Sequence, residues 1–272
     1  MGVLNVTPDS FFDGGRYADR HRALDHAHRM LDNGAAIIDI GGESTRPGAA
    51  PTAEAEELDR VLPLFEALRA DCDARGVPLS VDTRKPAVMR AAIAAGASMV
   101  NDINALRASG AIDSVAESGA AVCLMHMQGE PLTMQKTATY DDDVVAVVTA
   151  FLAERAQACE RAGIARGRIA VDPGFGFGKT LNHNLELLRR LAEIVALGYP
   201  VVAGLSRKST IGTLTGRPVE ERGAGSLAAA LAAVAGGASL LRVHDVRETV
   251  DALKIWQAVQ AARHVDSAGG SA

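Results

Sequence analysis

The sequence predicts an α/β protein that folds as a single (β/α)8 TIM barrel. Eight short apolar runs are separated, in most cases, by segments long enough for a helix. Such an alternation favours a closed parallel barrel, and the length of 272 residues is close to the roughly 250 typical of this fold. Each run also stops at, or just before, a polar residue that a buried strand would not need. Because these barrels carry their chemistry at the carboxyl ends of the strands, the polar residues mark a candidate active site.

The eight apolar runs are the predicted strands. They cover residues 3–6, 36–40, 79–81, 98–100, 121–125, 169–171, 201–205 and 240–243. The polar residues at their ends are Asn5, Asp39, Asp82, Asn101, His126, Asp172, Ser206 with Lys208, and Arg242 with His244. Parallel strands all end at the same mouth of a barrel, so these side chains are expected to face one shared site.

The first connections carry clear helix signals. Residues 19–33 have apolar side chains at helical spacing and end before Gly34. The second helix is expected to start near Thr52, a good N-cap residue, with glutamates in its first turn. Pro86 suits the first turn of the third helix, and the fourth helix is short, near residues 110–118.

The second half of the chain continues the alternation. The three aspartates at 141–143 look like a metal site at first, but acidic residues at the start of an amphipathic helix are the favoured interpretation. The sixth helix is expected from about Asn184. Residues 212–223 interrupt the next connection, a helix then runs to about Gly236, and a final helix carries Trp256.

The composition supports one large domain and argues against some classes of protein. Apolar residues make up 48% of the chain, and the net charge of −5 argues against a nucleic-acid partner. No secretory signal is expected, because the N-terminal residues lack a basic region and a long apolar run. No membrane span is expected either, because the most apolar long stretch, 226–241, is mostly alanine and glycine. Three cysteines without metal-like spacing indicate reduced thiols in a cytoplasmic protein. We expect the barrel to occupy residues 1–265 and a disordered tail to occupy 266–272.

A glycine-rich segment follows the sixth strand. Residues 172–180 read Asp-Pro-Gly-Phe-Gly-Phe-Gly-Lys-Thr, but Pro173 stands where a phosphate-binding P-loop needs its first glycine. A different role fits better: Asp172 points into the mouth, and the glycines let backbone approach a flat ligand. A tight strand-to-helix turn in which Asp172 is an N-cap remains the alternative.

Three further features of the strand ends suggest ligand chemistry. Asp82, Asn101 and Asp172 come from three strands, and a carboxylate can hold a ring that offers adjacent N–H donors, such as a pterin; helix capping is the alternative. Arg207, Lys208, Arg242 and His244 follow strands seven and eight, where barrels often bind phosphate, although Arg207 could be a solvated surface charge. Arg242 lies inside an apolar strand, where an unpaired charge is costly.

The loops after the first two strands are long, polar and punctuated by glycine and proline. Loops of this kind at a barrel mouth can act as lids. Asn5 could offer its amide oxygen to a hard cation such as Mg²⁺, which usually takes few protein ligands plus phosphate oxygens and water.

Taken together, these segments resemble the dihydropteroate synthase family. The matching stretches, in order along nearly the whole chain, are residues 2–15, 39–48, 80–83, 100–103, 124–129, 172–179, 206–208 and 242–246. The resemblance implies a pterin-binding TIM barrel that joins 6-hydroxymethyl-7,8-dihydropterin pyrophosphate to 4-aminobenzoate in folate synthesis, with Mg²⁺ as cofactor. It also implies a homodimer through the helices that follow strands seven and eight. Position 12 is Phe, where many members have a small polar residue.

The resemblance also implies roles for individual residues. The pterin ring would be held by Asp82, Asn101, Asp172 and Lys208. The pyrophosphate and its Mg²⁺ would be served by Asn5, Arg242 and His244. The aminobenzoate site, where sulfonamides would compete, would be shaped by Phe11, Thr45, Arg46, Pro47 and Ser206. Met125 would be a further substrate contact, Asp13 would pair with Arg46 when the loops close, and the catalytic set would be Lys208, Arg242, His244 and Asp82.

Two other functions remain open from the sequence alone. A pterin-binding barrel of a folate methyltransferase would share the pterin-holding Asp and Asn residues, but it would need neither the pyrophosphate set nor the Thr45-Arg46-Pro47 loop. A non-catalytic pterin-binding subunit would be favoured by the loss of Asn5, Arg46, Lys208 or Arg242, and all four are present.

Overall fold

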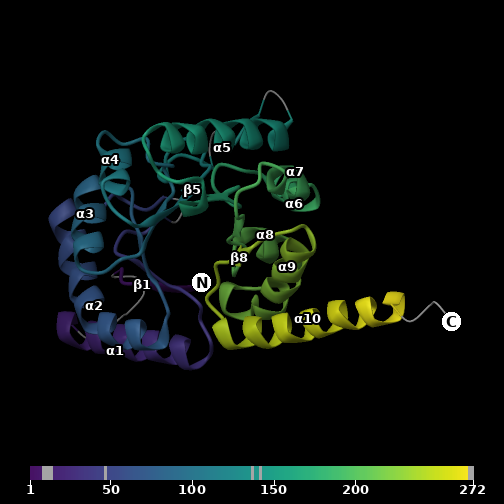
Figure 1. The fold of residues 1–272 in the computed structure, drawn as a ribbon, viewed down its shortest axis with the longest axis horizontal. Helices are drawn as coiled ribbons and strands as arrows, with labels where there is room; N and C mark the ends of the chain where they lie inside the picture. Colours follow the sequence, from purple (N-terminus) through teal and green to yellow (C-terminus); the bar gives the residue numbers. More distant parts are fainter. Residues whose placement is uncertain (8–14, 46–47, 136–137, 141–142, 269–272) are drawn as a thin grey trace.

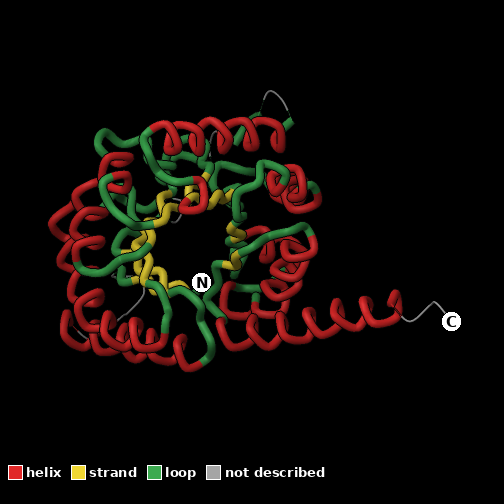
Figure 2. Tube along the Cα trace, viewed as in Figure 1, coloured by secondary structure: helices red, strands yellow, loops and turns green. Residues whose placement is uncertain are grey.

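The computed structural model describes residues 1–7, 15–45, 48–135, 138–140 and 143–268. Its strands form a ring at the centre of the molecule, surrounded by helices (Figures 1 and 2). The strands are β1 (Gly2–Asn5), β2 (Ile38–Gly41), β3 (Leu79–Asp82), β4 (Met99–Asp102), β5 (Ala121–Met125), β6 (Ile169–Asp172), β7 (Val202–Ala203) and β8 (Leu240–Leu241).

The ring consists of parallel strands in sequence order. Strands β1 to β6 form one sheet, and β7 pairs with β8. Single parallel bridges connect the two sheets, from Val171 to Val201 on one side and from Gly2 to Val243 on the other. The predicted (β/α)8 barrel is therefore confirmed, although β7 and β8 are shorter than the apolar runs at 201–205 and 240–243.

An outer ring of helices covers the strands (Figure 2). The helices are α1 (Gly15–Asp32), α2 (Glu54–Arg75), α3 (Pro86–Ala94), α4 (Ala111–Ala116), α5 (Val144–Arg161), α6 (Leu181–Arg189), α7 (Leu191–Val195), α8 (Ser209–Thr215), α9 (Gly223–Ala235) and α10 (Val246–Ala268). Short 3-10 turns occupy Arg166–Arg168 and Val219–Glu221. Leu64, Phe65 and Leu68 of α2 are among the fully or nearly fully buried side chains between this ring and the strands.

The interior of the barrel has two layers with different chemistry. One is an apolar cluster in which Met99, Cys123, Ala170 and Val202 pack together. The other is polar and includes the side chains at the carboxyl ends of the strands. Strand register sets these levels, because Asp39 pairs with Ser80, whereas Asp82 pairs with Gly41, two residues further along β2. Asp39 therefore lies deeper in the barrel than Asp82.

Two predicted helix starts are corrected by the structure. Thr52 is not the N-cap of α2: its N–H donates to Glu43 Oε1 at 2.9 Å, and Ala53 occupies the cap position. Helix α6 starts before Asn184, because the hydroxyl of Thr180 accepts the N–H of His183 and caps the helix. The interruption expected at 212–223 is also shorter, since residues up to Thr215 belong to α8.

The ends of two later helices bear on earlier expectations. Asp143 caps α5 by accepting the N–H of Val145 at 3.0 Å, as expected for an acidic helix start, while 141–142 lie outside the described residues. Helix α10 continues through Ala268, so it enters the segment expected to be disordered. In Figure 1 the far part of α10 projects beyond the ring of helices. Among the helices described, none is long and apolar enough to cross a membrane.

Candidate active site

An arginine bound by two carboxylates lies at the centre of the barrel mouth. Arg242 follows β8, and its Nε donates to Asp39 Oδ2 at 2.7 Å. Its Nη2 donates to Asp82 Oδ2 at 2.6 Å. Burial alone would lower the pKa of Arg242, but the two carboxylates more than offset this, so the pKa is raised and the guanidinium stays charged. The three strands β2, β3 and β8 are thereby connected through one side chain.

The polar cluster extends to β4 through Asn101. The amide of Asn101 donates to Asp39 Oδ2 at 3.1 Å, so Asp39 is shared between Asn101 and Arg242. Asp39 is fully buried. The pKa of Asp82 is raised to about 7, mainly by burial, with Arg242 acting in the opposite direction. The mouth is thus lined by the carboxylates of Asp39 and Asp82, and Arg242 favours the charged form of Asp82.

Asp172 and Lys208 form the opposite side of the mouth. Asp172 ends β6, and its Oδ1 accepts the N–H of Gly174 at 2.6 Å. Burial raises the pKa of Asp172, and Lys208 opposes that shift. The Lys208 ammonium donates to the carbonyl of Phe175 at 2.5 Å and lies 4.8 Å from the centre of the Phe177 ring. Burial lowers the pKa of Lys208 to about 8, against the attraction of Asp172.

Two glycines keep space open beside these groups. A Cβ added to Gly204 would lie 3.6 Å from Lys208 Nζ and 3.9 Å from Asp172 Oδ2. A Cβ added to Gly41 would lie 3.3 Å from Asn5 Oδ1 and 3.5 Å from Asp82 Oδ2. Larger side chains at these two positions would fill room that the polar groups share. A flat ligand could use this room, as expected for glycine at a close approach.

The cationic residues after β7 and β8 do not all face the same way. Arg207 has a positive φ of 59° and forms an ion pair with Asp245, with 3.0 Å between Nε and Oδ2. It therefore connects the two loops instead of standing free as a surface charge. His244 is half-buried, and both its N–H and its Nδ1 contact the hydroxyl of Ser206, at 3.2 and 3.1 Å. Burial, aided by Arg242, lowers the pKa of His244 to about 4, so its ring is neutral at pH 7.

The segment after β2 is anchored at its base by charged side chains. Glu43 accepts the N–H of Thr52 at 2.9 Å and a hydrogen bond from Arg84 at 3.1 Å. Lys85 lies 3.2 Å from the same carboxylate and also pairs with the buried Glu57. Burial raises the pKa of Glu43, but the hydrogen bonds from Thr52 and Arg84 more than offset this effect. The pKa is therefore lowered overall, and Glu43 is ionised. Thr45, in the segment that Glu43 closes, is half-buried.

Some residues implied by the family resemblance lie outside the described part of the chain. These are Phe11, Asp13, Arg46 and Pro47. Met125 ends β5, is buried, and packs in a small cluster with Ile103, Met127 and Met134, against which Phe177 also packs. Asn5 ends β1 and is half-buried.

Two residues at the site carry contacts that the sequence alone did not reveal. The sequence predicts Asp39 as a polar residue of the second strand but indicates no function for it. The feature that could have revealed one is a charged residue inside the apolar run 36–40. Lys179 was part of the glycine-rich segment, yet it is buried and its ammonium lies 2.9 Å from His126 Nδ1. His126 is also buried, and burial lowers its pKa to about 3.

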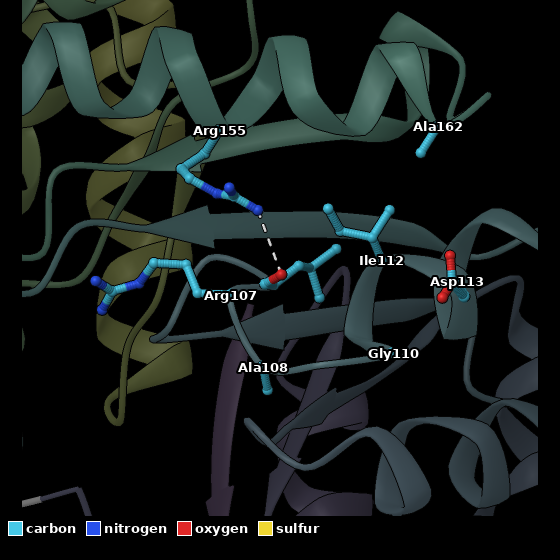
Figure 3. A pocket seen from close by; sticks show the side chains of 8 residues that line it. Arg107, Ala108, Gly110, Ile112, Asp113, Arg155 and Ala162 are labelled. Atoms are coloured by element: carbon cyan, nitrogen blue, oxygen red, sulfur yellow. Dashed lines mark hydrogen bonds between the residues drawn. The ribbon is translucent and has the colours of Figure 1, made fainter.

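A cavity of about 580 Å³ lies away from these residues, between the segment after β4 and helix α5 (Figure 3). Arg155 reaches across it and donates to the carbonyls of Ala105 and Leu106, at 3.0 and 3.3 Å. Those two residues have positive φ angles of 51° and 53°. Buried Asp102 supports the same turn by accepting the N–H of Leu106 at 2.8 Å. Arg155 and Asp102 thus hold a strained turn on the outer wall, directly after Asn101.

Comparisons with known proteins show the family to which the chain belongs. A family model described as pterin binding enzyme matches residues 1–244. Dihydropteroate synthase of Escherichia coli K12 is 50% identical over 263 residues, which are 97% of this chain and 92% of the relative. A solved Xanthomonas albilineans dihydropteroate synthase with 4-aminobenzoic acid has a TM-score of 0.90 at 55% identity, covering 96% of this chain and 92% of that one. Its complex with 7,8-dihydropteroate gives 0.87 at 53% identity, with 96% and 93% covered.

The fold and the matched model first define the class: the chain is a TIM barrel that matches the model of the pterin binding enzymes over residues 1–244. The chain belongs to the pterin-binding enzyme family, and within it to the dihydropteroate synthases. The predicted family, the predicted fold and the predicted transferase activity in folate biosynthesis are therefore confirmed.

Removing the charge of Asp39 should weaken the centre of the barrel. We expect Asp39→Asn to lower the free energy of unfolding by about 3 kcal/mol, because it deprives a buried guanidinium of one partner. Urea denaturation measures the change. The control is Asp251→Asn, whose side chain is 64% exposed on α10 and which should cost less than about 0.5 kcal/mol. Equal stability of the two variants would contradict the central position given to Asp39.

Proposed function

We propose that the chain joins 6-hydroxymethyl-7,8-dihydropterin pyrophosphate to 4-aminobenzoate, with the polar groups of the barrel mouth providing the binding and the electrostatics. In the reaction the bond between the methylene carbon and the phosphate oxygen breaks, and its electron pair leaves with pyrophosphate. The amine nitrogen forms a bond to the methylene carbon and loses one proton. The observation that carries the proposal is the Asp39–Arg242–Asp82 cluster at the barrel mouth of a chain that belongs to this family.

The pterin ring is assigned to the side of the mouth formed by Asp172, Asn101 and Asp82. Asp172 uses Oδ1 for the N–H of Gly174, and its Oδ2 faces the space beside Gly204. A carboxylate oxygen placed there can accept the adjacent N–H donors of a 2-amino-4-oxo ring. Lys208, positioned between the Phe175 carbonyl and the same space, can donate to a ring acceptor. Met125 supplies an apolar contact from the end of β5.

The pyrophosphate is assigned to Arg242 and His244. Arg242 is held through Nε and Nη2, so its Nη1 amino group takes part in neither ion pair and can donate to a phosphate oxygen. His244 is neutral at pH 7 and acts as a hydrogen-bond donor instead of a second cation. Fixed donors aimed at the departing oxygens stabilise the charge that develops there. The amine is neutral at pH 7, so the residues have to position it but need not act as a strong base.

Asn5 is the residue we assign to Mg²⁺. Its Oδ1 and Asp82 Oδ2 both face the small space left by the missing side chain of Gly41, and oxygen donors suit this ion. Within the described residues, no group of three or more His, Cys, Asp or Glu could form a metal cage. One protein oxygen with substrate phosphates and water is a usual magnesium arrangement, so the residues fit. The ion would neutralise charge on the pyrophosphate.

The aminobenzoate is assigned to the segment after β2 and to the neighbourhood of Ser206. The base of that segment is fixed by Glu43, two residues before Thr45, which supports giving Thr45 a role in this site. Phe11, Arg46 and Pro47 keep the roles implied by the family resemblance. The hydroxyl of Ser206 is bonded to His244, so Ser206 also orients the imidazole ring that we assign to the pyrophosphate.

We also propose a cytoplasmic homodimer. The three cysteines are free and buried, as expected in a reducing compartment. Helix α10 exposes Ile255 and Val259 at 69% and 51%, one turn apart along the helix. The far part of this helix projects from the barrel (Figure 1). Helix α9 packs beside α10, so the two helices together offer one continuous surface to a second copy.

The reaction can be tested directly with the purified protein. We expect pyrophosphate release and dihydropteroate formation only when pterin pyrophosphate, Mg²⁺ and 4-aminobenzoate are all present. Each component is omitted in turn, and both products are quantified. Sulfonamide inhibition should be relieved by excess 4-aminobenzoate. Binding of the pterin without any turnover would reject the proposed reaction for this chain.

The role of Asp172 predicts a specific loss of affinity. Asp172→Asn removes the charge and one acceptor, so we expect pterin pyrophosphate to bind at least about tenfold more weakly, or about 1.4 kcal/mol. Isothermal titration calorimetry measures it, with Asp251→Asn as the control. Unchanged affinity in a folded Asp172→Asn variant would remove Asp172 from the pterin site.

The dimer proposal predicts the mass in solution. Light scattering should give about twice 28.3 kDa for the native chain. A double change, Ile255→Asp with Val259→Asp, should reduce the mass to that of one chain, because charges would be buried in the contact. Leu132→Asp changes a residue that is 54% exposed elsewhere on the surface and should leave the dimer intact. A monomeric native chain would overturn the proposal.

A further inference from the structure

Lys179 is a buried ammonium surrounded by acceptors. Its side chain is 3% exposed. The Nζ atom donates to the carbonyls of Gly174, Phe177 and His126, at 3.0, 3.1 and 3.3 Å. It also lies 2.9 Å from His126 Nδ1. A buried charge is tolerated only when it is well paired, and here three backbone carbonyls and one ring nitrogen provide the partners.

The protonation of the two groups fits this arrangement. An ammonium has no acceptor capacity, so Nδ1 of His126 has to accept and the ring carries its proton on Nε2. Burial, followed by the charge of Lys179, lowers the pKa of His126 to about 3, which keeps the ring neutral. Burial lowers the pKa of Lys179 to about 7, while Asp172 acts to raise it. Any positive charge on the pair is therefore carried by the lysine and not by the ring.

The segment that surrounds Lys179 is pressed against the end of β5. Gly174 and Gly178 have positive φ angles of 68° and 64°. A Cβ at Gly174 would lie 1.9 Å from the carbonyl oxygen of His126, and one at Gly178 would lie 2.5 Å from that of Gln128. The backbone can follow this path only with glycine at both positions. The carbonyls of Gly174 and Phe177 accept from Nζ.

The same segment presents two groups to Lys208. The carbonyl of Phe175 accepts from Lys208 Nζ, and the ring of Phe177 lies 4.8 Å from that atom. The segment begins at Asp172, whose Oδ1 accepts the N–H of Gly174. Gly174 is therefore bonded both to the Lys179 ammonium, through its carbonyl, and to the carboxylate of Asp172, through its N–H.

We propose that Lys179 is a positioning residue for the pterin site: its ammonium serves as an internal cation that folds residues 174–177 and so fixes Lys208 and Asp172. The inference rests on the proposed function, because the pterin is the ligand that those two residues hold. Lys179 itself does not touch the substrate. Its removal should change pterin binding far more than aminobenzoate binding, because three of the five residues assigned to the aminobenzoate, Thr45, Arg46 and Pro47, lie on the segment after β2.

The test uses Lys179→Ala in the full-length chain. This variant removes the Lys179 donor from three carbonyls and from His126 Nδ1, although the carbonyl of Gly174 still accepts the N–H of Phe177 at 3.1 Å. The space left behind matches the lost propylammonium group. We expect the Kd and the KM for pterin pyrophosphate to rise at least about tenfold, or about 1.4 kcal/mol, with the KM for 4-aminobenzoate changed less than about twofold. Added propylammonium should restore part of the affinity, whereas tetramethylammonium, which has no N–H donor, should not. Lys254→Ala, exposed on α10, is the matched control.

The possible outcomes separate the two proposals. Circular dichroism establishes that the variant is folded; if Lys179→Ala is not, Lys179→Met keeps the apolar stem and replaces it in the same measurements. A folded variant with unchanged pterin affinity, or one whose loss is the same for both substrates and is not restored by propylammonium, overturns the positioning role. A native chain that makes no dihydropteroate overturns the proposed function instead, whatever Lys179 does.

Discussion

The ion pairs of Arg242 with Asp39 and Asp82 are the contacts on which the barrel mouth depends. A guanidinium inside a barrel has to be paired, and the two carboxylates come from neighbouring strands, β2 and β3. Asp39 also accepts from Asn101 of β4, so three strands are bound to the arginine that follows β8. The same contacts close the ring of strands across the pair formed by β8 and β1, where backbone pairing is limited to a bridge between Gly2 and Val243.

A second buried amino group, that of Lys179, contacts the loop after β6 on the opposite side of the mouth, and its partners differ in kind from those of Arg242. Arg242 is neutralised by carboxylates, whereas the direct partners of Lys179 are neutral: three carbonyl oxygens and an imidazole nitrogen. The first arrangement connects strands, and the second folds a loop onto a strand end. Lys208 stands between them, close to Asp172 and bonded to the loop that Lys179 folds. The side of the mouth that we assign to the pterin is thus built almost entirely from strand ends and one short loop.

Much of the fold was predictable from the sequence because each apolar run ended in a polar residue. The alternation of strands and helices predicts the barrel. The polar residues at the strand ends predict that Asp82, Asn101, Asp172 and Arg242 lie at its mouth. The depth of Asp39 was not predictable, since one residue in an apolar run does not reveal register, and only the pairing of Asp39 with Ser80 places it below Asp82. Local sequence preference predicts Thr52 as a helix cap, but its N–H donates to Glu43, nine residues earlier in the chain, and this contact is not visible in the local sequence. His244 counted as a cation from its residue type, while burial beside Arg242 makes it neutral.

The two ends of the segment 43–52 are held together by one carboxylate, since Glu43 accepts the N–H of Thr52. The base of the segment is therefore fixed by a single side chain, and a substitution of Glu43 would release both of its ends. An inhibitor that occupies the space beside Gly204 and Asp172 meets a group that we assign to the pterin, so a substitution of Asp172 that excluded the inhibitor would also weaken binding of the substrate.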